Sequence, residues 1–244
     1  MTKTKLTNSL TNSSNPILFF DTGPIISLVI SRLDWILPLL KKQFGGKFYI
    51  TPAVHHELIE RPLTIRRFEF EALQVLKLVR EGVLEVYDQV PMDKVKELQS
   101  LANSSFLMEN KTIDVLQSGE LESVASALKL NAAGVVMDER TLRLFIENSS
   151  AMVQLLSKRF QKNITTDTNK IKQFTQQFKT SSFVIIRSIE LASLAYRLGY
   201  LNSYLPDQKN GKDILLDSIF WTIKLNGCAV TEEEINDLKK FLLK

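Results

Sequence analysis

Two short apolar runs, each followed by an aspartate, constrain the fold of this chain more than any other feature. Residues 17–20 form one run and precede Asp21, and residues 133–137 form the other and precede Asp138. Continuous apolar runs of this length are typical of strands that are buried on both faces, as in parallel sheets covered by helices. Each run therefore predicts a buried strand with an acidic residue at its carboxyl end.

The rest of the first 150 residues alternates between short apolar runs and stretches with helical spacing. Strands are predicted at 17–20, 47–50, 84–87 and 133–137, and helices are predicted after Asp21, at 33–40, from Thr51-Pro52, at 63–80, after Pro91 and at 118–130. Pro24 and Pro52 both fall in the first turn of a predicted helix, where proline is tolerated. This order predicts an α/β fold with a central parallel β-sheet flanked by helices.

The region after Asp138 is mostly helical in its spacing. Helices are predicted at 183–198, at 214–225 and from Thr231, which stands three residues before Glu234 in the spacing of a capping box. No linker rich in Pro, Gly or Ser divides the chain. We therefore predict a disordered tail at 1–15 and a single domain at 16–244, made of a core (16–149), a helical hairpin insertion (150–179) and extra C-terminal helices (180–244).

Composition limits the class of protein. The chain has 244 residues, of which 44% are hydrophobic, so it can bury one large core or two smaller ones. Its single cysteine, Cys228, excludes an internal disulfide and a zinc ribbon. No apolar run is long enough to cross a membrane, and the polar first residues do not resemble a signal peptide. These observations predict a cytoplasmic protein without a membrane partner.

Four acidic residues are predicted to meet at one edge of the sheet. Asp21 and Asp138 follow strands, Glu57 lies in the helix that begins at Pro52, and Glu120 lies in the first turn of its helix. Ligands of open parallel sheets collect beyond the carboxyl ends of the strands. Clustered carboxylates repel one another unless a cation lies between them, and oxygen ligands suit Mg²⁺ or Mn²⁺. The pattern therefore predicts a divalent-metal site.

The segments that contain these four acids resemble the motifs of PIN domains. They are residues 19–24 (FFDTGP), 51–58 (TPAVHHEL), 118–128 (SGELESVASAL) and 135–140 (VVMDER). The resemblance covers about 15–149 and extends more weakly over 180–225. It implies a PIN-like fold and a Mg²⁺- or Mn²⁺-dependent ribonuclease in which Asp21, Glu57, Glu120 and Asp138 are the metal-binding and catalytic residues. The third acid is Glu120, where many PIN domains have aspartate.

Each of these residues also has an ordinary structural explanation. Asp21 and Asp138 could be turn or helix-capping residues, and Glu57 and Glu120 could be solvated acids in the first half of a helix. Thr22 could hold a metal-bound water or a phosphate, or it could cap the following helix.

Two neighbouring acids, Glu122 and Glu139, are predicted to lie outside the metal site. Helical direction is expected to turn Glu122 away from Glu120.

Basic residues suggest where RNA would bind. Arg140 follows the fourth acid, and residues 151–179 carry six basic residues against one acid, although the whole chain has a net charge of only +4. We predict that Lys158, Arg159 and Lys162 guide the RNA backbone and that Thr22 and Arg140 contact it, because phosphates attract cations. The alternatives are a solvated helical hairpin or a homodimer contact.

Two functions remain open on the sequence. The first is a divalent-metal-dependent endoribonuclease, and the second is a PIN-like RNA-binding or scaffold protein with little or no nuclease activity. An antitoxin-type protein partner is a possibility at the level of the family, and nothing in the sequence indicates one.

Overall fold

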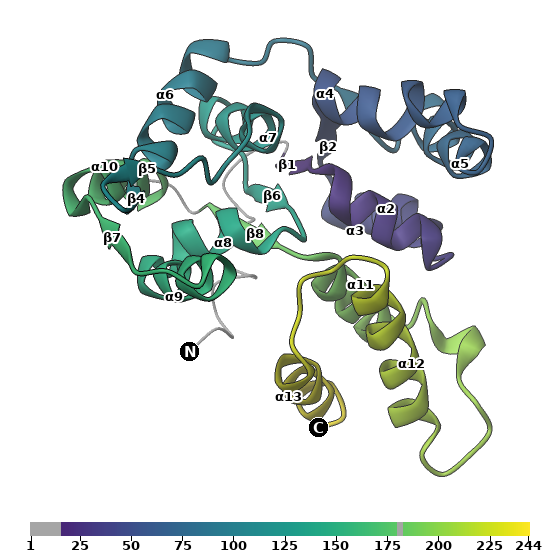
Figure 1. Cartoon of the computed structure of the whole chain (residues 1–244). Coiled ribbons are helices and arrows are strands. Elements are labelled where there is room, and N and C mark those ends of the chain that lie inside the picture. Colours follow the sequence, from purple (N-terminus) through teal and green to yellow (C-terminus); the bar gives the residue numbers. More distant parts are fainter. Residues whose placement is uncertain (1–15, 180–182) are drawn as a thin grey trace.

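A five-stranded parallel sheet forms the centre of the molecule (Figure 1). The computed structural model describes residues 16–179 and 183–244, so the predicted tail at 1–15 lies outside the described residues. The strands occur in the order β3-β2-β1-β6-β8, and all four pairings are parallel. Their bounds are β1 Ile17–Phe20, β2 Lys47–Ile50, β3 Glu85–Val86, β6 Gly134–Val136 and β8 Val184–Ile186. The predicted α/β class with a parallel sheet is confirmed.

The central strand β1 separates two hydrophobic cores. Leu18 and Phe20 belong to one core and Phe19 to the other, because successive side chains of a strand point to opposite faces. On one side of β1, Leu18 pairs with Gly134 of β6. A Cβ atom at Gly134 would lie 2.1 Å from the carbonyl oxygen of Val184, so only glycine lets β8 approach β6 this closely.

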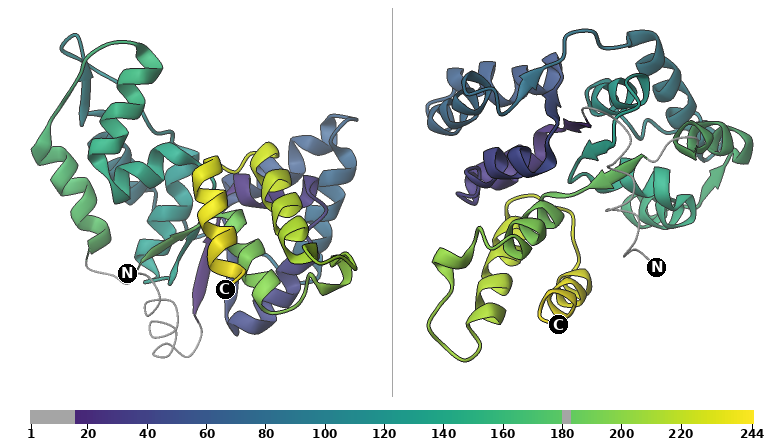
Figure 2. Two further views of the ribbon diagram at one scale, coloured as in Figure 1. Left: turned by 90° about the horizontal axis from the view of Figure 1, so that it is seen from below. Right: turned by 180° about the vertical axis from the view of Figure 1, so that it is seen from behind.

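The helices divide between the two faces of the sheet (Figure 2). The face that contains Leu18 and Phe20 is covered by α2 Thr22–Ile30, α3 Ile36–Phe44, α4 Pro52–His55, the π-helix η1 His56–Glu60, α5 Glu69–Arg80, α11 Ser188–Arg197, α12 Gly211–Leu225 and α13 Glu232–Leu242. The face that contains Phe19 is covered by α6 Met92–Asn103, α7 Ser118–Lys129, α8 Arg140–Glu147, α9 Ser149–Phe160 and α10 Thr168–Lys179. Both cores are therefore built on one sheet.

Local sequence explains where the helices around the carboxyl edge begin. The side chain of Thr51 accepts a hydrogen bond from the backbone N–H of Val54 (3.4 Å), and Pro52 takes the first helical position of α4. The predicted capping box of α13 is confirmed, since Thr231 and Glu234 each bond the other's backbone N–H (3.2 and 2.8 Å). The start of α2 directly after Asp21 also agrees with the sequence.

The predicted helix at 183–198 is wrong at its beginning. Residues Val184–Ile186 form the edge strand β8, and the helix α11 begins at Ser188. The run Phe183-Val184-Ile185-Ile186 contains three β-branched residues, which favour a strand. The predicted helix at 63–80 likewise begins only at Glu69, after the 3₁₀ turn η2 Pro62–Thr64.

A second sheet, which the sequence did not predict, joins the hairpin region to the core. The short strands β5 Lys111–Thr112, β4 Phe106–Met108 and β7 Ile164–Thr166 pair antiparallel in the order β5-β4-β7. The strand β7 therefore lies between the two helices α9 and α10 of the predicted insertion. Phe174 of α10 stacks on Phe145 of α8 with ring centroids 4.2 Å apart, so the region packs as part of the core around Phe19.

Candidate functional site

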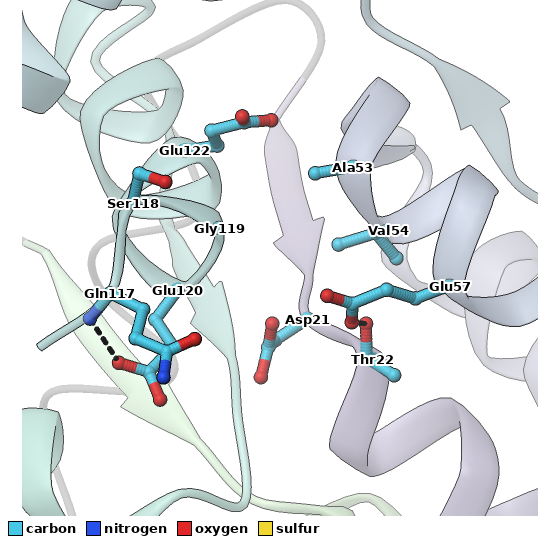
Figure 3. A pocket seen from close by; sticks show the side chains of 10 residues that line it. All are labelled: Asp21, Thr22, Ala53, Val54, Glu57, Gln117, Ser118, Gly119, Glu120 and Glu122. Carbon is cyan, nitrogen blue, oxygen red and sulfur yellow. Dashed lines mark hydrogen bonds between the residues drawn. The ribbon is translucent and has the colours of Figure 1, made fainter.

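A pocket of about 440 Å³ lies between α7 and the helices that follow β1 and β2 (Figure 3). Its walls come from the start of α2, from α4 and η1, and from the first turn of α7. The lining residues are Asp21, Thr22, Ala53, Val54, Glu57, Gln117, Ser118, Gly119, Glu120 and Glu122. Four of them are acidic and none is Lys, Arg or His. The pocket is thus an acidic cleft at the carboxyl edge of the sheet.

Two of the acids face each other from neighbouring elements. Asp21 follows β1 and is held by a hydrogen bond from its backbone N–H to the carbonyl of Val136 (2.9 Å). Glu57 lies in the π-helical turn η1, and the hydroxyl of Thr22 donates to its Oε2 atom at 2.7 Å. Figure 3 shows the Glu57 carboxylate directed toward Asp21. Thr22 therefore positions Glu57 and does not cap α2, whose N-cap residue is Asp21.

The surroundings of Asp21 disfavour its charged form. Burial raises the pKa of Asp21 to about 7, with smaller contributions in the same direction from the negative charges of Glu120 and Glu57. The backbone N–H groups of Thr22 and Gly23 act in the opposite direction. Burial also raises the pKa of Glu120, and the charges of Glu139 and Glu57 add to this effect. A cation in the pocket would relieve this repulsion.

The third acid, Glu120, is turned toward its own helix. Its Oε2 atom accepts a hydrogen bond from the backbone N–H of Gln117 at 3.0 Å, which is the glutamate half of a capping box. Across residues 16–179 and 183–244, no three His, Cys, Asp or Glu side chains are already arranged to hold one metal ion. Glu120 would therefore have to turn away from Gln117 to join Asp21 and Glu57 as a metal ligand.

Glu122 is turned away from Glu120, as the sequence predicted, and it nevertheless lies at the pocket. Glu122 lines the pocket, and Figure 3 shows it on the opposite side of the first turn of α7 from Glu120. Gly119, which precedes Glu120, lines the same turn, and the nearest atom to a Cβ built there would be Oε1 of Glu57 at 3.8 Å. The pocket therefore reaches both sides of this turn, which helical spacing alone could not reveal.

Asp138 does not line the pocket, so the predicted convergence of four carboxylates is not seen for this residue. Asp138 is only 2% exposed, and it accepts three hydrogen bonds. The Ser27 hydroxyl donates at 2.9 Å, the Ser188 hydroxyl at 2.7 Å and the Ser188 backbone N–H at 2.8 Å. These bonds tie the end of β6 to α2 and α11. No sequence pattern marked the two serines as its partners.

The neighbouring acid Glu139 also has a structural partner. Its Oε2 atom accepts a hydrogen bond from the backbone N–H of Leu142 (2.7 Å), so it caps α8. Its predicted place outside the acidic pocket agrees with the lining residues.

The basic residues predicted to bind RNA lie outside the acidic pocket. Lys158, Arg159 and Lys162 are exposed near the end of α9 and before β7, on the side of the molecule away from α4 and η1 (Figures 1 and 2). Lys162 also pairs with Glu109 at 2.7 Å. Arg140, the first residue of α8, lines a second pocket.

Comparisons of the chain with protein-family models, with curated proteins and with solved structures gave no match. Among residues 16–179 and 183–244, no helix combines the length and the apolar composition needed to span a bilayer.

Proposed function

We propose that this protein is a divalent-metal-dependent endoribonuclease of the PIN type, with its active site in the acidic pocket. The observation that carries the proposal is a cleft at the carboxyl edge of a parallel sheet in which Asp21, Glu57, Glu120 and Glu122 gather without a basic lining residue. Ligand sites of such sheets lie at this edge. A set of carboxylate oxygens suits the hard cations Mg²⁺ and Mn²⁺.

The residues of the pocket have different tasks in this proposal. Asp21 and Glu57 would hold the metal, with Glu120 and Glu122 on the facing helix as additional ligands. A bound divalent ion would supply an activated water and would stabilise the negative charge that develops on the phosphate. Thr22 keeps the Glu57 carboxylate directed toward Asp21 through its hydrogen bond. No covalent intermediate with the protein is needed.

The second candidate is a PIN-like RNA-binding or scaffold protein with little nuclease activity. Two observations favour it: Asp138 is buried and bound by serine donors, and Glu120 caps its own helix. Against it, a scaffold has no need to keep several repelling carboxylates in a cleft, one of which has a pKa raised to about 7. We therefore rank the nuclease first.

The test is RNA cleavage by the purified full-length chain. Single-stranded and structured RNAs are incubated with Mn²⁺, with Mg²⁺ or with a chelator, beside the Asp21→Asn variant. Cleavage that needs the metal and disappears in the variant supports the nuclease. Equal cleavage by both proteins would point to a contaminating nuclease, and no cleavage under any condition would favour the scaffold.

The remaining proposals concern location and partners. We propose a cytoplasmic protein whose partner is RNA. Guidance of RNA by Lys158, Arg159 and Lys162 stays a proposal, and a homodimer contact through the same region is the alternative. An Ala substitution of all three should flatten the salt dependence of RNA binding by about 0.7 log units per lost phosphate contact on single strands.

A further inference from the structure

A second pocket, of about 400 Å³, lies where α8 meets the end of α12 and the loop before α13. Its lining residues are Arg140, Arg143, Leu144, Lys224, Cys228, Ala229, Val230, Thr231 and Glu234. Three of these side chains are cationic and one is acidic. The pocket therefore has the opposite charge from the cleft that contains Asp21.

The single acid of this pocket is already neutralised. Arg187 binds Glu234 at 2.9 Å, and Glu234 also accepts the backbone N–H of Thr231 at 2.8 Å. Both bonds help lower the pKa of Glu234 against the effect of its burial, so it stays charged and paired. The charge of Arg143 also helps lower the pKa of Glu234, so this carboxylate offsets part of the positive charge of the cavity and the cations remain in excess.

The cations, in contrast, keep free bonding capacity. Arg140 is exposed and has no ion pair among the described residues. The Nε atom of Arg143 is buried and finds no hydrogen-bond partner in the same residues, while its Nη1 atom lies 3.8 Å from Glu147. Among the described residues, Lys224 donates a hydrogen bond to one backbone carbonyl, that of Val230, and its Nζ atom lies 5.6 Å from the centre of the Trp221 ring. A buried N–H without a partner costs free energy, which a bound anion would recover.

Backbone hydrogen bonds at the end of β6 link this segment to one lining residue of each pocket. The carbonyl of Val136 accepts from the backbone N–H of Asp21, which lines the acidic pocket (2.9 Å). The carbonyl of Asp138, two residues later, accepts from the N–H of Ala229, which lines the basic pocket (3.3 Å). Two residues of extended chain span at most about 7 Å. The two lining residues Asp21 and Ala229 are therefore anchored to backbone carbonyls no more than about 7 Å apart along the chain.

We infer that the basic pocket is a phosphate-binding subsite, in which Arg140, Arg143 and Lys224 hold an RNA backbone phosphate next to the cleavage site. The inference rests on the proposed ribonuclease function for the identity of the ligand. Arg side chains offer several donors to one phosphate, and Lys adds a point charge. The positive charge of the subsite would attract the RNA backbone toward an acidic cleft that would otherwise repel it.

The test compares two variants of the full-length chain, each of which removes two positive charges. One variant changes residues that line the basic pocket, and the other changes residues near the start of α12. The site variant is Arg140→Gln/Lys224→Gln. The control is Lys209→Gln/Lys212→Gln, whose side chains are exposed near the start of α12. Since α12 has 15 residues and rises about 1.5 Å per residue, the control charges lie roughly 20 Å from the pocket. Melting curves establish that both variants fold.

Binding of a labelled single-stranded oligoribonucleotide is measured by fluorescence anisotropy in chelator, over a series of salt concentrations. The site variant should bind about tenfold more weakly, and its salt slope should fall by about 1.4 for two lost phosphate contacts. The control should keep the parental affinity and slope. If the site variant does not fold, Arg140→Gln alone should lower the slope by about 0.7.

Three outcomes would overturn the inference. The first is that the site variant keeps the affinity and salt slope of the parental chain. The second is that the site and control variants lose the same affinity. The third is that the parental chain binds a hexaglutamate peptide as tightly as RNA, which would assign the pocket to acidic peptides. Cleavage with Mn²⁺ is measured separately on the parental chain. If the site variant loses RNA binding and the parental chain does not cleave RNA, the proposed nuclease function is refuted and the phosphate-binding subsite is supported. Failure of the nuclease proposal can therefore be distinguished from failure of the subsite proposal.

Discussion

Two aspartates that look alike in the sequence have opposite surroundings in the structure. Asp21 and Asp138 each follow an apolar strand, and their strands β1 and β6 are direct neighbours. Asp138 is buried and accepts hydrogen bonds from Ser27 and Ser188, whereas Asp21 lines a pocket beside other acids and has a pKa raised to about 7. The difference separates a carboxylate that is held by hydrogen bonds in the core from one whose charged form is disfavoured by burial and by neighbouring acids.

The largest effect is expected when the charge of Asp21 is removed. The Asp21→Asn change should lower metal-dependent RNA cleavage by more than about a hundredfold, because it removes a metal ligand at nearly constant shape. The rate is measured with Mn²⁺ on a labelled oligoribonucleotide. The matched control is Asp114→Asn, an exposed acid before α7 that does not line the pocket. Equal losses in the two variants would refute the special role of Asp21.

Removal of the other aspartate should act on stability. Asp138→Ala leaves both Ser188 donors without their acceptor in a buried position, while the Ser27 hydroxyl keeps the carbonyl of Asn226 at 3.2 Å. We expect a loss of about 3 kcal/mol in the free energy of unfolding, measured with urea, because unsatisfied buried donors cost roughly 1 to 3 kcal/mol each. A variant with normal stability and no cleavage would instead show that Asp138 is a metal ligand.

The two aspartates should also differ in how pH affects stability. The pKa of Asp21 rises from 3.8 to about 7 on folding in the absence of metal. A raised acid pKa penalises the folded state as pH climbs through 3.8, and the full penalty is reached above about 7. Asp21→Asn should therefore raise the free energy of unfolding by about 2 kcal/mol at pH 8, after allowance for solvent screening at the pocket mouth, and by little at pH 4. Urea unfolding in chelator at both pH values checks this, and an equal change at both would contradict it.

The sequence predicted the parallel sheet and the strand-end positions of both aspartates, because these depend on local apolar runs and on helix-start signals such as Thr51-Pro52. It could not predict which aspartate is satisfied. The partners of Asp138 are Ser27 and Ser188, which lie 111 and 50 residues away in the chain. No sequence pattern indicates that a given serine makes a tertiary hydrogen bond. Long-range packing therefore decides which of the two aspartates is held by hydrogen bonds in the core and which faces the pocket.

The same dependence on long-range packing explains the other features that the sequence did not predict. Edge strand β8 and the small sheet of β4, β5 and β7 contain only two or three residues per strand, too few to show a period. Glu122 lines the pocket because the first turn of α7 faces α4 and η1, and this placement depends on the assembled fold. Short strands and pocket walls follow from the assembled core and not from nearby residues.

Two hydroxyl groups of α2, one at the acidic pocket and one at Asp138, allow the same comparison with smaller expected effects. Thr22 donates to Glu57 in the acidic pocket. Thr22→Val keeps the shape of the side chain and removes the donor, so Glu57 should lose its fixed orientation and cleavage should fall about tenfold. The free energy of unfolding should change by less than about 0.5 kcal/mol, since the site is solvated. Steady-state cleavage and urea unfolding of the same preparation separate the two effects, and a purely structural loss would argue against the positioning role.

The smallest effect is expected for Ser27, which lies five residues further along the same helix and donates to Asp138. Ser27→Ala leaves Asp138 with the two Ser188 donors, so the variant should lose only about 1 kcal/mol in the free energy of unfolding. Its cleavage rate should equal that of the parental chain, because Ser27 touches nothing in the acidic pocket. Ser218→Ala, at an exposed serine whose hydroxyl bonds within α12, is the control and should change stability very little. If Ser27→Ala lowers cleavage as much as Thr22→Val while stability is unchanged, Asp138 takes part in the reaction and the division between an anchoring and a metal-binding aspartate fails.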